Sequence, residues 1–274
     1  MSKKINLLET GNRLLAAQKI VLCCHVSPDG DTLGSALGLA RLLEQKGKEV
    51  TVFVDDDINK SLSFIPGVDK VQRPEAGVIV EADLFVVVDA SSFDRVGICN
   101  EVVKAPVLLN IDHHISNTEF ADYLYLDAEA AAAGEIMCDL FEAMGWEYDE
   151  AIAVDFYTAI TTDCGSFRYS NTTSKTMQRA AKLLDYGVKP NEISDMLDIR
   201  SRKTTELLAK VLPSLTFDYE GKVAHITITN DLYDKETQEF MRDVWVSVNE
   251  TSGNGTFDNP TSLDNAYASV SPFG

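Results

Sequence analysis

Short apolar runs alternate with helical patterns along the first two thirds of the chain, and this alternation limits the folds open to it. The strand-like runs cover residues 20–24, 50–54, 84–88, 107–111 and 123–126. The helical patterns cover residues near 5–15, 32–47, 130–144, 149–162 and 174–186. Continuously apolar strands separated by helices are typical of a parallel sheet that is covered on both faces. We therefore predict an α/β fold with a parallel sheet of about five strands flanked by helices.

Aspartate and histidine residues directly follow three of these predicted strands. In a parallel sheet such residues meet at one edge, which is the usual ligand crevice of an open α/β sheet. Carboxylates and imidazoles packed closely repel one another unless a cation compensates them. The pattern therefore predicts a metal site, most simply for two ions. The residues, in chain order, are His25, Asp29, Asp31, Asp89, Asp112, His113 and His114.

Several of the polar residues also have an ordinary structural interpretation. An aspartate after a strand, such as Asp89, is often only a turn residue, and Asp163 could be an ordinary loop residue after a helix. The acidic run 55–57 follows a strand but has no imidazole near it, so we interpret it as an exposed loop. We expect His225, in a predicted strand, to be structural or on the surface. Convergence of three strand ends favours the metal site over a set of unrelated turns.

The charge of the chain narrows the possible partners. The formal net charge is −19 and the sequence pI is near 4.5. Duplex nucleic acid requires a basic face, so duplex DNA is not an expected partner, whereas a small anion held by bound metals is compatible with this charge. The five cysteines form no Cys-x-x-Cys pair, and no long apolar stretch is present. We expect reduced thiols, a cytoplasmic location and no membrane contact.

The character of the sequence changes near Pro190. We predict a catalytic domain over residues 1–190 and a helical connector over 191–212. A partial α+β second domain is expected over 213–274, with a hairpin near 215–228. The stretch from 244 to the end has no Lys or Arg and weak periodicity, so we expect an irregular tail there.

The ordered motifs of the first domain closely resemble those of the DHH phosphoesterase family. A lone Asp-His-His would be weak evidence, but here four motifs occur in order at strand and helix ends. The resemblance covers about residues 1–190, and its style is similar to that of the bacterial subgroup that degrades very short RNA and pAp (3′-phosphoadenosine 5′-phosphate). The residues that carry it are His25-x-x-x-Asp29-x-Asp31, Asp89, Asp112-His113-His114 and Asp163, with Leu33-Gly34-Ser35, Asp94-Arg95-Val96-Gly97 and the stretch 162–169 in support.

This resemblance implies a two-metal phosphoesterase that hydrolyses short oligoribonucleotides, pAp or both with metal-activated water. Asp89 would bridge the two ions. Imidazole and carboxylate ligands suit Mn²⁺, with Mg²⁺ as the rival ion. The other ligands would form two sets, which are His25 with Asp29, and Asp31 with His113 and Asp163.

The resemblance also implies roles around the metals. Neighbouring residues of an extended chain point in opposite directions, so His114 would face the substrate phosphate while its neighbour holds metal. Asp112 could orient an imidazole through a hydrogen bond. Arg95 and Arg168 are the candidate substrate-binding cations. The expected partners are short RNA oligonucleotides or small nucleotide phosphates, and a homodimer is possible.

The C-terminal part departs from the family pattern. Members of the subgroup carry a DHHA1 substrate-binding domain with a Gly-rich segment that ends in His. Residues 214–232 are similar to its beginning, but no Gly-Gly-Gly-His segment follows, and the last cation is Arg242. We therefore expect normal metal binding and weak binding of short RNA. Two alternatives stay open, namely a hydrolase of linear dinucleotide, pyrophosphate or polyphosphate, and a metal-binding remnant with little turnover.

Overall fold

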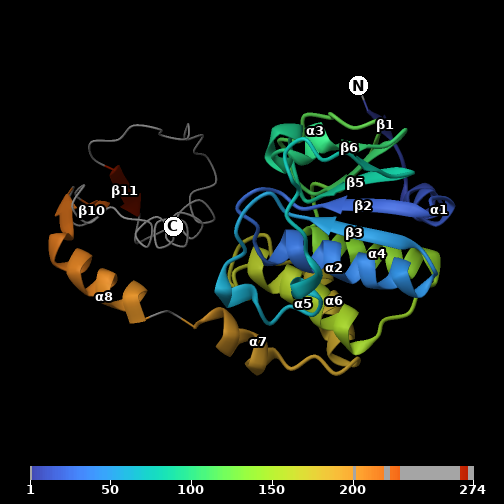
Figure 1. The fold of residues 1–274 in the computed structure, drawn as a ribbon. Coiled ribbons are helices and arrows are strands. Elements are labelled where there is room, and N and C mark those ends of the chain that lie inside the picture. Colours follow the sequence, from blue (N-terminus) through green and yellow to red (C-terminus); the bar gives the residue numbers. More distant parts are fainter. Residues whose placement is uncertain (1, 200–201, 219–222, 229–265, 271–274) are drawn as a thin grey trace. The chain divides into compact units, whose positions relative to one another are not determined.

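The computed structural model describes residues 2–199, 202–218, 223–228 and 266–270 (Figure 1). The chain divides into two compact units, Met1–Asp198 and Ile199–Gly274, which are described separately. None of the helices among the described residues is long and apolar enough to cross a membrane.

The first unit is built on a six-stranded sheet in which every neighbouring pair of strands is parallel. The predicted parallel sheet is thus confirmed, and a two-residue strand adds a sixth member at one edge. The order across the sheet is β1 (Lys3–Lys4), β8 (Tyr123–Leu126), β7 (Leu108–Asp112), β5 (Leu84–Val88), β2 (Lys19–Cys23) and β3 (Glu49–Phe53).

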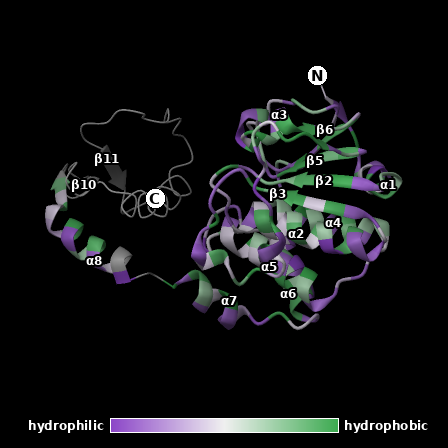
Figure 2. Cartoon of the chain, in the orientation of Figure 1, coloured by the Kyte–Doolittle hydropathy of each residue, from purple (hydrophilic) through white to green (hydrophobic). Residues whose placement is uncertain are grey.

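The central strands are apolar throughout because both of their faces are covered. In β2, Ile20 and Leu22 belong to the larger core, and Val21 and Cys23 belong to a second core on the other face. All four side chains are fully buried. Successive strand residues point to opposite faces, so a strand buried on both sides needs apolar residues at every position. Strands β2 and β5 are accordingly coloured as largely hydrophobic in Figure 2.

Helices cover both faces of the sheet (Figure 1). The larger layer contains α1 (Leu7–Ala16), α2 (Gly30–Gln45), α4 (Ala133–Met144), α5 (Glu150–Asp163) and α6 (Ser174–Leu184). The other face carries the 3₁₀ turn η3 (Phe93–Val96), α3 (Cys99–Val102) and a small parallel pair formed by β4 (Val80–Glu81) and β6 (Val103–Lys104). Two more 3₁₀ turns, η1 (Lys60–Leu62) and η2 (Val68–Lys70), follow β3, and α7 (Pro190–Leu197) ends the unit.

Glycines let α2 and α5 approach each other at backbone distance. A Cβ atom on Gly34 would lie 2.3 Å from the carbonyl oxygen of Asp155, and one on Gly30 would lie 2.5 Å from Thr162 Cγ2. Only a residue without a side chain fits such a contact. The close approach brings the C-terminal end of α5, with Asp163, beside the N-terminal end of α2, which begins directly after Asp29.

The second unit contains α8 (Arg202–Val211), the 3₁₀ turn η4 (Leu212–Ser214), and strands β9 (Thr216–Asp218), β10 (Val223–Ile228) and β11 (Ala266–Val270). Strand β10 pairs antiparallel with β9, as the expected hairpin requires, and also with β11. Residues 266–270 therefore form a strand inside the tail that we expect to be irregular. The rest of that tail, and Arg242 before it, lie outside the described residues. The division at residues 190 and 212 stays a prediction.

Candidate metal centre

The candidate centre lies where the strand order of the sheet reverses. From β2 the chain continues to β3 on one side, while β5, the other neighbour of β2, continues to β7 on the opposite side. Such a reversal leaves a crevice beyond the carboxyl ends of the two strands. His25 lies two residues after the end of β2, and Asp89 directly follows β5. The fold therefore places these two residues beside each other.

Asp89 is the residue that the other groups surround. Its backbone is left-handed, with φ of 59°, which is uncommon for a non-glycine residue and is found at functional sites. The side chain is buried, and Oδ1 has no hydrogen-bond partner among the described residues. A buried carboxylate oxygen without a donor is costly. A cation at this position would remove that cost, so the residues present fit a metal.

One possible ligand group consists of His25, Asp29 and Asp89, whose ligand atoms all lie within 4.8 Å of one another. His25 Nε2 is 3.6 Å from Asp29 Oδ2 and 3.6 Å from Asp89 Oδ2. His25 Nδ1 lies 2.8 Å from the carbonyl oxygen of Val26, and donation to that oxygen leaves Nε2 as the ligand atom. Asp29 caps α2, because its Oδ1 accepts the amides of Asp31 and Thr32 while Oδ2 faces the imidazole.

A second group consists of Asp31, His113 and Asp163, again within 4.8 Å of one another. His113 Nε2 is 3.7 Å from Asp31 Oδ2, 3.5 Å from Asp163 Oδ2 and 3.3 Å from Asp89 Oδ1. The other ring nitrogen, Nδ1, is 3.2 Å from the carbonyl oxygen of Ala130. Asp89 therefore lies against the imidazoles of both groups, which is the arrangement that a bridging ligand requires.

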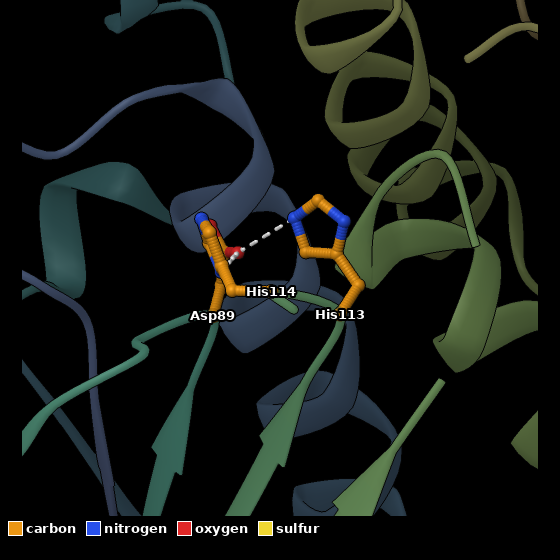
Figure 3. A group of neighbouring side chains, drawn as sticks. All are labelled: Asp89, His113 and His114. Carbon is orange, nitrogen blue, oxygen red and sulfur yellow. Dashed lines mark ion pairs between the residues drawn. The ribbon is translucent and has the colours of Figure 1, made fainter. Parts of the chain in front are cut away.

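His114 lies beside Asp89 and His113 (Figure 3), but its shortest contact is with Asp112. Its ring lies 4.5 Å from that of His113, centroid to centroid, at 54°. His114 Nδ1 is 3.7 Å from Asp89 Oδ1 but only 2.7 Å from Asp112 Oδ1. The shorter contact commits Nδ1–H to Asp112, which leaves Nε2 as the nitrogen that can meet a ligand.

Asn117, which the sequence reasoning missed, holds Asp112, and Asn110, missed as well, holds Asn117. Asn117 Nδ2 donates to Asp112 Oδ2 at 2.6 Å and to Asn110 Oδ1 at 2.7 Å. Asn110 Nδ2 in turn donates to the carbonyl oxygens of Val87 and Ala90, two residues before and one residue after Asp89. An amide residue inside the otherwise apolar run 107–111 was the available sequence signal. The chain of contacts fixes the carboxylate that orients His114.

Burial and opposite charges pull the pKa values of the centre in different directions. Burial by itself would lower the pKa of the two ligand imidazoles, but the neighbouring carboxylates raise it to about 10 for His25 and about 11 for His113. Burial would raise the pKa of Asp89, but the same two imidazoles hold it well below its usual range. Burial and repulsion from Asp89 raise the pKa of Asp163 to about 7. Protons therefore occupy the positions that cations would fill.

The candidate substrate cations lie in different surroundings. Arg95 Nη2 is 3.2 Å from His25 Nδ1, so the structure brings Arg95 to this centre. Arg168 is exposed, and its Nε donates to the carbonyl oxygen of Gly165 at 2.8 Å, in the turn after Asp163.

The acidic run after β3 braces the loops around the centre. Asp56 Oδ2 accepts the amide of Ser27 at 2.9 Å, and Asp55 Oδ2 accepts the amide of Ile98 at 2.8 Å. Asp57 is exposed and pairs with Arg73 at 3.2 Å. Among the described residues, no group of possible metal ligands includes any of the three acids. The run thus lies in a loop, as expected, but Asp55 and Asp56 are partly buried, and Asp57 alone of the three is exposed.

Comparison with known proteins identifies the family. The model of the DHH family, N-terminal domain, matches residues 19–164. The chain belongs to the DHH family. The matched region contains both ligand groups and His114, namely His25, Asp29, Asp31, Asp89, His113, His114 and Asp163.

Relatives of this DHH-family chain are named for different enzymatic activities. A Thermus thermophilus protein named bifunctional oligoribonuclease and PAP phosphatase is 35% identical over 215 residues, which cover 77% of this chain and 64% of the relative. The chain thus spans less than two thirds of that relative. A probable manganese-dependent inorganic pyrophosphatase of Enterococcus faecalis is 25% identical, with 77% of this chain and 71% of the relative covered.

A solved structure supports the fold over most of the chain. An exopolyphosphatase-related protein from Bacteroides fragilis superposes with a TM-score of 0.77 at 26% identity, covering 85% of this chain and 71% of that chain. The two chains therefore share the α/β architecture.

Proposed function

We propose that the chain is a two-metal-dependent phosphoesterase that hydrolyses short oligoribonucleotides, pAp or both. The observation that carries the proposal is the sharing of Asp89. This buried carboxylate lies 3.6 Å from His25 and 3.3 Å from His113, and each imidazole belongs to a separate group of possible ligands. Two cation positions that share one carboxylate are typical of enzymes that hydrolyse phosphate esters.

The chemistry of the ligand atoms favours Mn²⁺ as the bound ion. Mixed imidazole and carboxylate sets suit Mn²⁺, and Mg²⁺ is the rival. His25 and Asp29 would hold one ion, and Asp89 would bridge. Asp31, His113 and Asp163 would hold the other ion. When bound, such ions activate a water molecule and neutralise charge on the phosphoryl oxygens.

His114 is proposed to act on the substrate. Burial would lower its pKa, but Asp112 and Asp89 raise it, so these carboxylates favour the protonated ring, in which Nε2–H can donate to a phosphoryl oxygen. Its side chain is 35% exposed, compared with 5% for His25, so a substrate can reach it. Asp112 holds the ring orientation as charge develops on the phosphate.

The name of the Thermus thermophilus relative supports nucleotides as the substrate class. Arg95, next to His25, is proposed to contact a substrate phosphate near the reacting one. Arg168, exposed after Asp163, is proposed to contact a more distant phosphate. Arginine suits both tasks because its planar guanidinium can bind two phosphate oxygens at once.

A substrate panel tests the proposal. Protein stripped with a chelator and reloaded with Mn²⁺ is incubated with pAp, pApA, RNA of two to five nucleotides, pyrophosphate and polyphosphate, and the products are separated by chromatography. We expect mononucleotides from the short RNA and inorganic phosphate from pAp. His114→Ala should greatly lower turnover. The surface variant Asp57→Asn is the matched control and should turn over like the wild type, because the ion pair of Asp57 within the described part of the chain is with exposed Arg73.

Three outcomes would contradict the proposal. Cleavage of pyrophosphate or polyphosphate alone would assign the site to inorganic substrates. Cleavage of none of the compounds, with Mn²⁺ bound, would mean that the chain holds metal without turnover. Equal activity with and without the chelator would remove the metals from the mechanism.

A further inference from the structure

A run of small residues at positions 130–134, which we call the alanine segment, leads from the loop after β8 into the first turn of α4. Ala131 and Ala132 are buried in the core. Ala132 is the N-cap of α4, but its side chain has no oxygen with which to cap the helix. The first amides of α4 are therefore open to acceptors from elsewhere in the fold.

The backbone of the alanine segment contacts two of the ligands. The carbonyl oxygen of Ala130 lies 3.2 Å from His113 Nδ1. The amide of Ala133 donates to Asp31 Oδ2 at 2.7 Å, and that of Gly134 donates to Asp31 Oδ1 at 2.9 Å. The orientation of both side chains thus depends on where this backbone lies.

Glu135 holds the alanine segment from inside the protein. Its side chain is buried, and Oε2 accepts the amide of Ala131 at 3.0 Å and the hydroxyl of Thr176 at 3.2 Å. Its Oε1 lies 3.8 Å from Lys175 Nζ. A buried carboxylate is expensive to keep unless its partners are well placed. Through these contacts Glu135 links Ala131 to α6, which carries Lys175 and Thr176.

Asn171 holds the same segment from the surface. Its Nδ2 donates to the carbonyl oxygen of Ala131 and to that of Asp163, each at 3.2 Å. The third ligand of the group is therefore joined to the alanine segment through one amide. Glu135 and Asn171 hold the two peptide units that meet at Ala131, since Glu135 accepts the N–H of Ala131 and Asn171 donates to its carbonyl oxygen.

The other ligand group has separate supports. His25 Nδ1 meets the carbonyl oxygen of Val26, and Asp29 Oδ1 is held by the first amides of α2. The described contacts of these two residues do not involve the alanine segment. A change in the segment should therefore affect one cation position more than the other.

We propose that Glu135 is a positioning residue that fixes the alanine segment and thereby shapes the cation site of Asp31, His113 and Asp163. This inference rests on the metal binding of the proposed function but not on its substrate. Groups behind the ligands of a metal site change metal affinity by about 10- to 100-fold when they are removed. The loss of affinity should affect the ion held by Asp31, His113 and Asp163 and not the other ion.

Mn²⁺ titration of the chelator-stripped full chain tests this, with calorimetry for affinity and electron paramagnetic resonance for the number of bound ions. The wild type should bind two ions. Glu135→Ala should weaken one ion by about 10- to 100-fold and leave the other within about twofold. Glu135→Gln should bind like the wild type, because its amide oxygen can still accept from Ala131 and Thr176. Rescue by glutamine separates positioning from charge.

Matched variants control for stability. Glu142 lies on the same helix, and Glu142→Ala removes ion pairs with Arg179 and Lys182 rather than a contact to the alanine segment. The affinities for both Mn²⁺ ions should therefore stay at the wild-type values. If Glu135→Ala does not fold by circular dichroism, Asn171→Asp is measured instead. Aspartate has the shape of asparagine but lacks its N–H donor, and position 171 is on the surface. Asn171→Asp should weaken binding of the ion held by Asp31, His113 and Asp163.

The outcomes separate this inference from the proposed function. A wild-type chain that binds no Mn²⁺ overturns both. A wild type that binds two ions and a folded Glu135→Ala that binds them equally well overturns the role of Glu135 alone. Equal weakening of both ions, or failure of Glu135→Gln to restore binding, also contradicts it.

Discussion

Replacement of Asn117 by alanine should damage both stability and turnover. The side-chain amide of Asn117 uses both hydrogens on buried acceptors, at 2.6 Å to Asp112 Oδ2 and at 2.7 Å to Asn110 Oδ1. Its own Oδ1 accepts the amide of Glu119 at 2.8 Å. Alanine would leave two buried acceptors without donors, one of them charged.

The magnitude follows from these contacts. A hydrogen bond to a charged group contributes about 1.5–3 kcal/mol, and a neutral one contributes about 0.5–1.5 kcal/mol. We therefore expect Asn117→Ala to lower the free energy of unfolding by about 2–4 kcal/mol. Asp112 would then hold His114 less firmly, and kcat should fall by about 10- to 100-fold. Since no metal ligand is lost, two Mn²⁺ ions should still bind.

Urea unfolding, steady-state kinetics on pAp and Mn²⁺ titration measure the three effects. Thr118→Ala is the neighbouring control, because it removes only the exposed bond from Thr118 Oγ1 to the carbonyl oxygen of Ser91 at 3.1 Å. That change should cost less than about 1 kcal/mol and leave kcat within about twofold. If Asn117→Ala matches Thr118→Ala in stability and kcat, the relay through Asp112 has no role.

Three further predictions concern charge in the core. Asp89→Asn should lower kcat more than about 100-fold and reduce the number of bound Mn²⁺ ions, because a bridging ligand serves both; unchanged stoichiometry in metal analysis would refute the bridge. Mn²⁺ binding near pH 7 should release protons from His25 and His113, whose pKa values are raised to about 10 and 11, so affinity should increase with pH. Calorimetry in two buffers of different ionisation enthalpy detects the protons, and heat independent of buffer would contradict the prediction. Burial raises the pKa of Asp155, whose carboxylate oxygens have no hydrogen-bond partner among the described residues, so the folded chain keeps this proton to a higher pH than the unfolded chain, which loses it near pH 4. Stability lost as pH rises should be recovered by Asp155→Asn, with a larger gain in urea unfolding at pH 8 than at pH 5; equal gains would refute the argument.

The sequence predicted the central strands, and placed the candidate ligands after them, for one physical reason. Strands buried on both faces read as uninterrupted apolar runs, so a carboxylate or imidazole directly after such a run marks the sheet edge. Strand β5 begins and ends at the predicted residues, and Asp89 follows it. The bounds of β2 and β3 lie one residue earlier than predicted, which moves no candidate ligand to another edge.

A strand that joins the sheet through backbone hydrogen bonds alone leaves no hydrophobic pattern in the sequence. Strand β1 consists of Lys3 and Lys4, and it joins the sheet through hydrogen bonds from the amide of Lys3 to the carbonyl oxygen of Asp122 and from that of Ile5 to Leu124. These contacts are independent of side-chain hydropathy, so periodicity could not reveal the strand.

The residues that hold the backbone near the candidate ligands also could not be predicted from the sequence. Glu135 and Asn171 act on the backbone of Ala131 from positions 4 and 40 residues away. Such contacts depend on how α4, α5 and α6 pack, and a charged residue in a helical pattern ordinarily indicates a solvated face. Asn110 was different, because an amide within an apolar strand already departs from the pattern.

Anomalous diffraction from crystals of the full chain with Mn²⁺ tests the central claim most directly. The account predicts two manganese peaks between the ends of β2, β5 and β7, one beside His25 and Asp29 and the other beside His113, with Asp89 contacting both. A single peak at saturating Mn²⁺, or two peaks that Asp89 does not join, would contradict it.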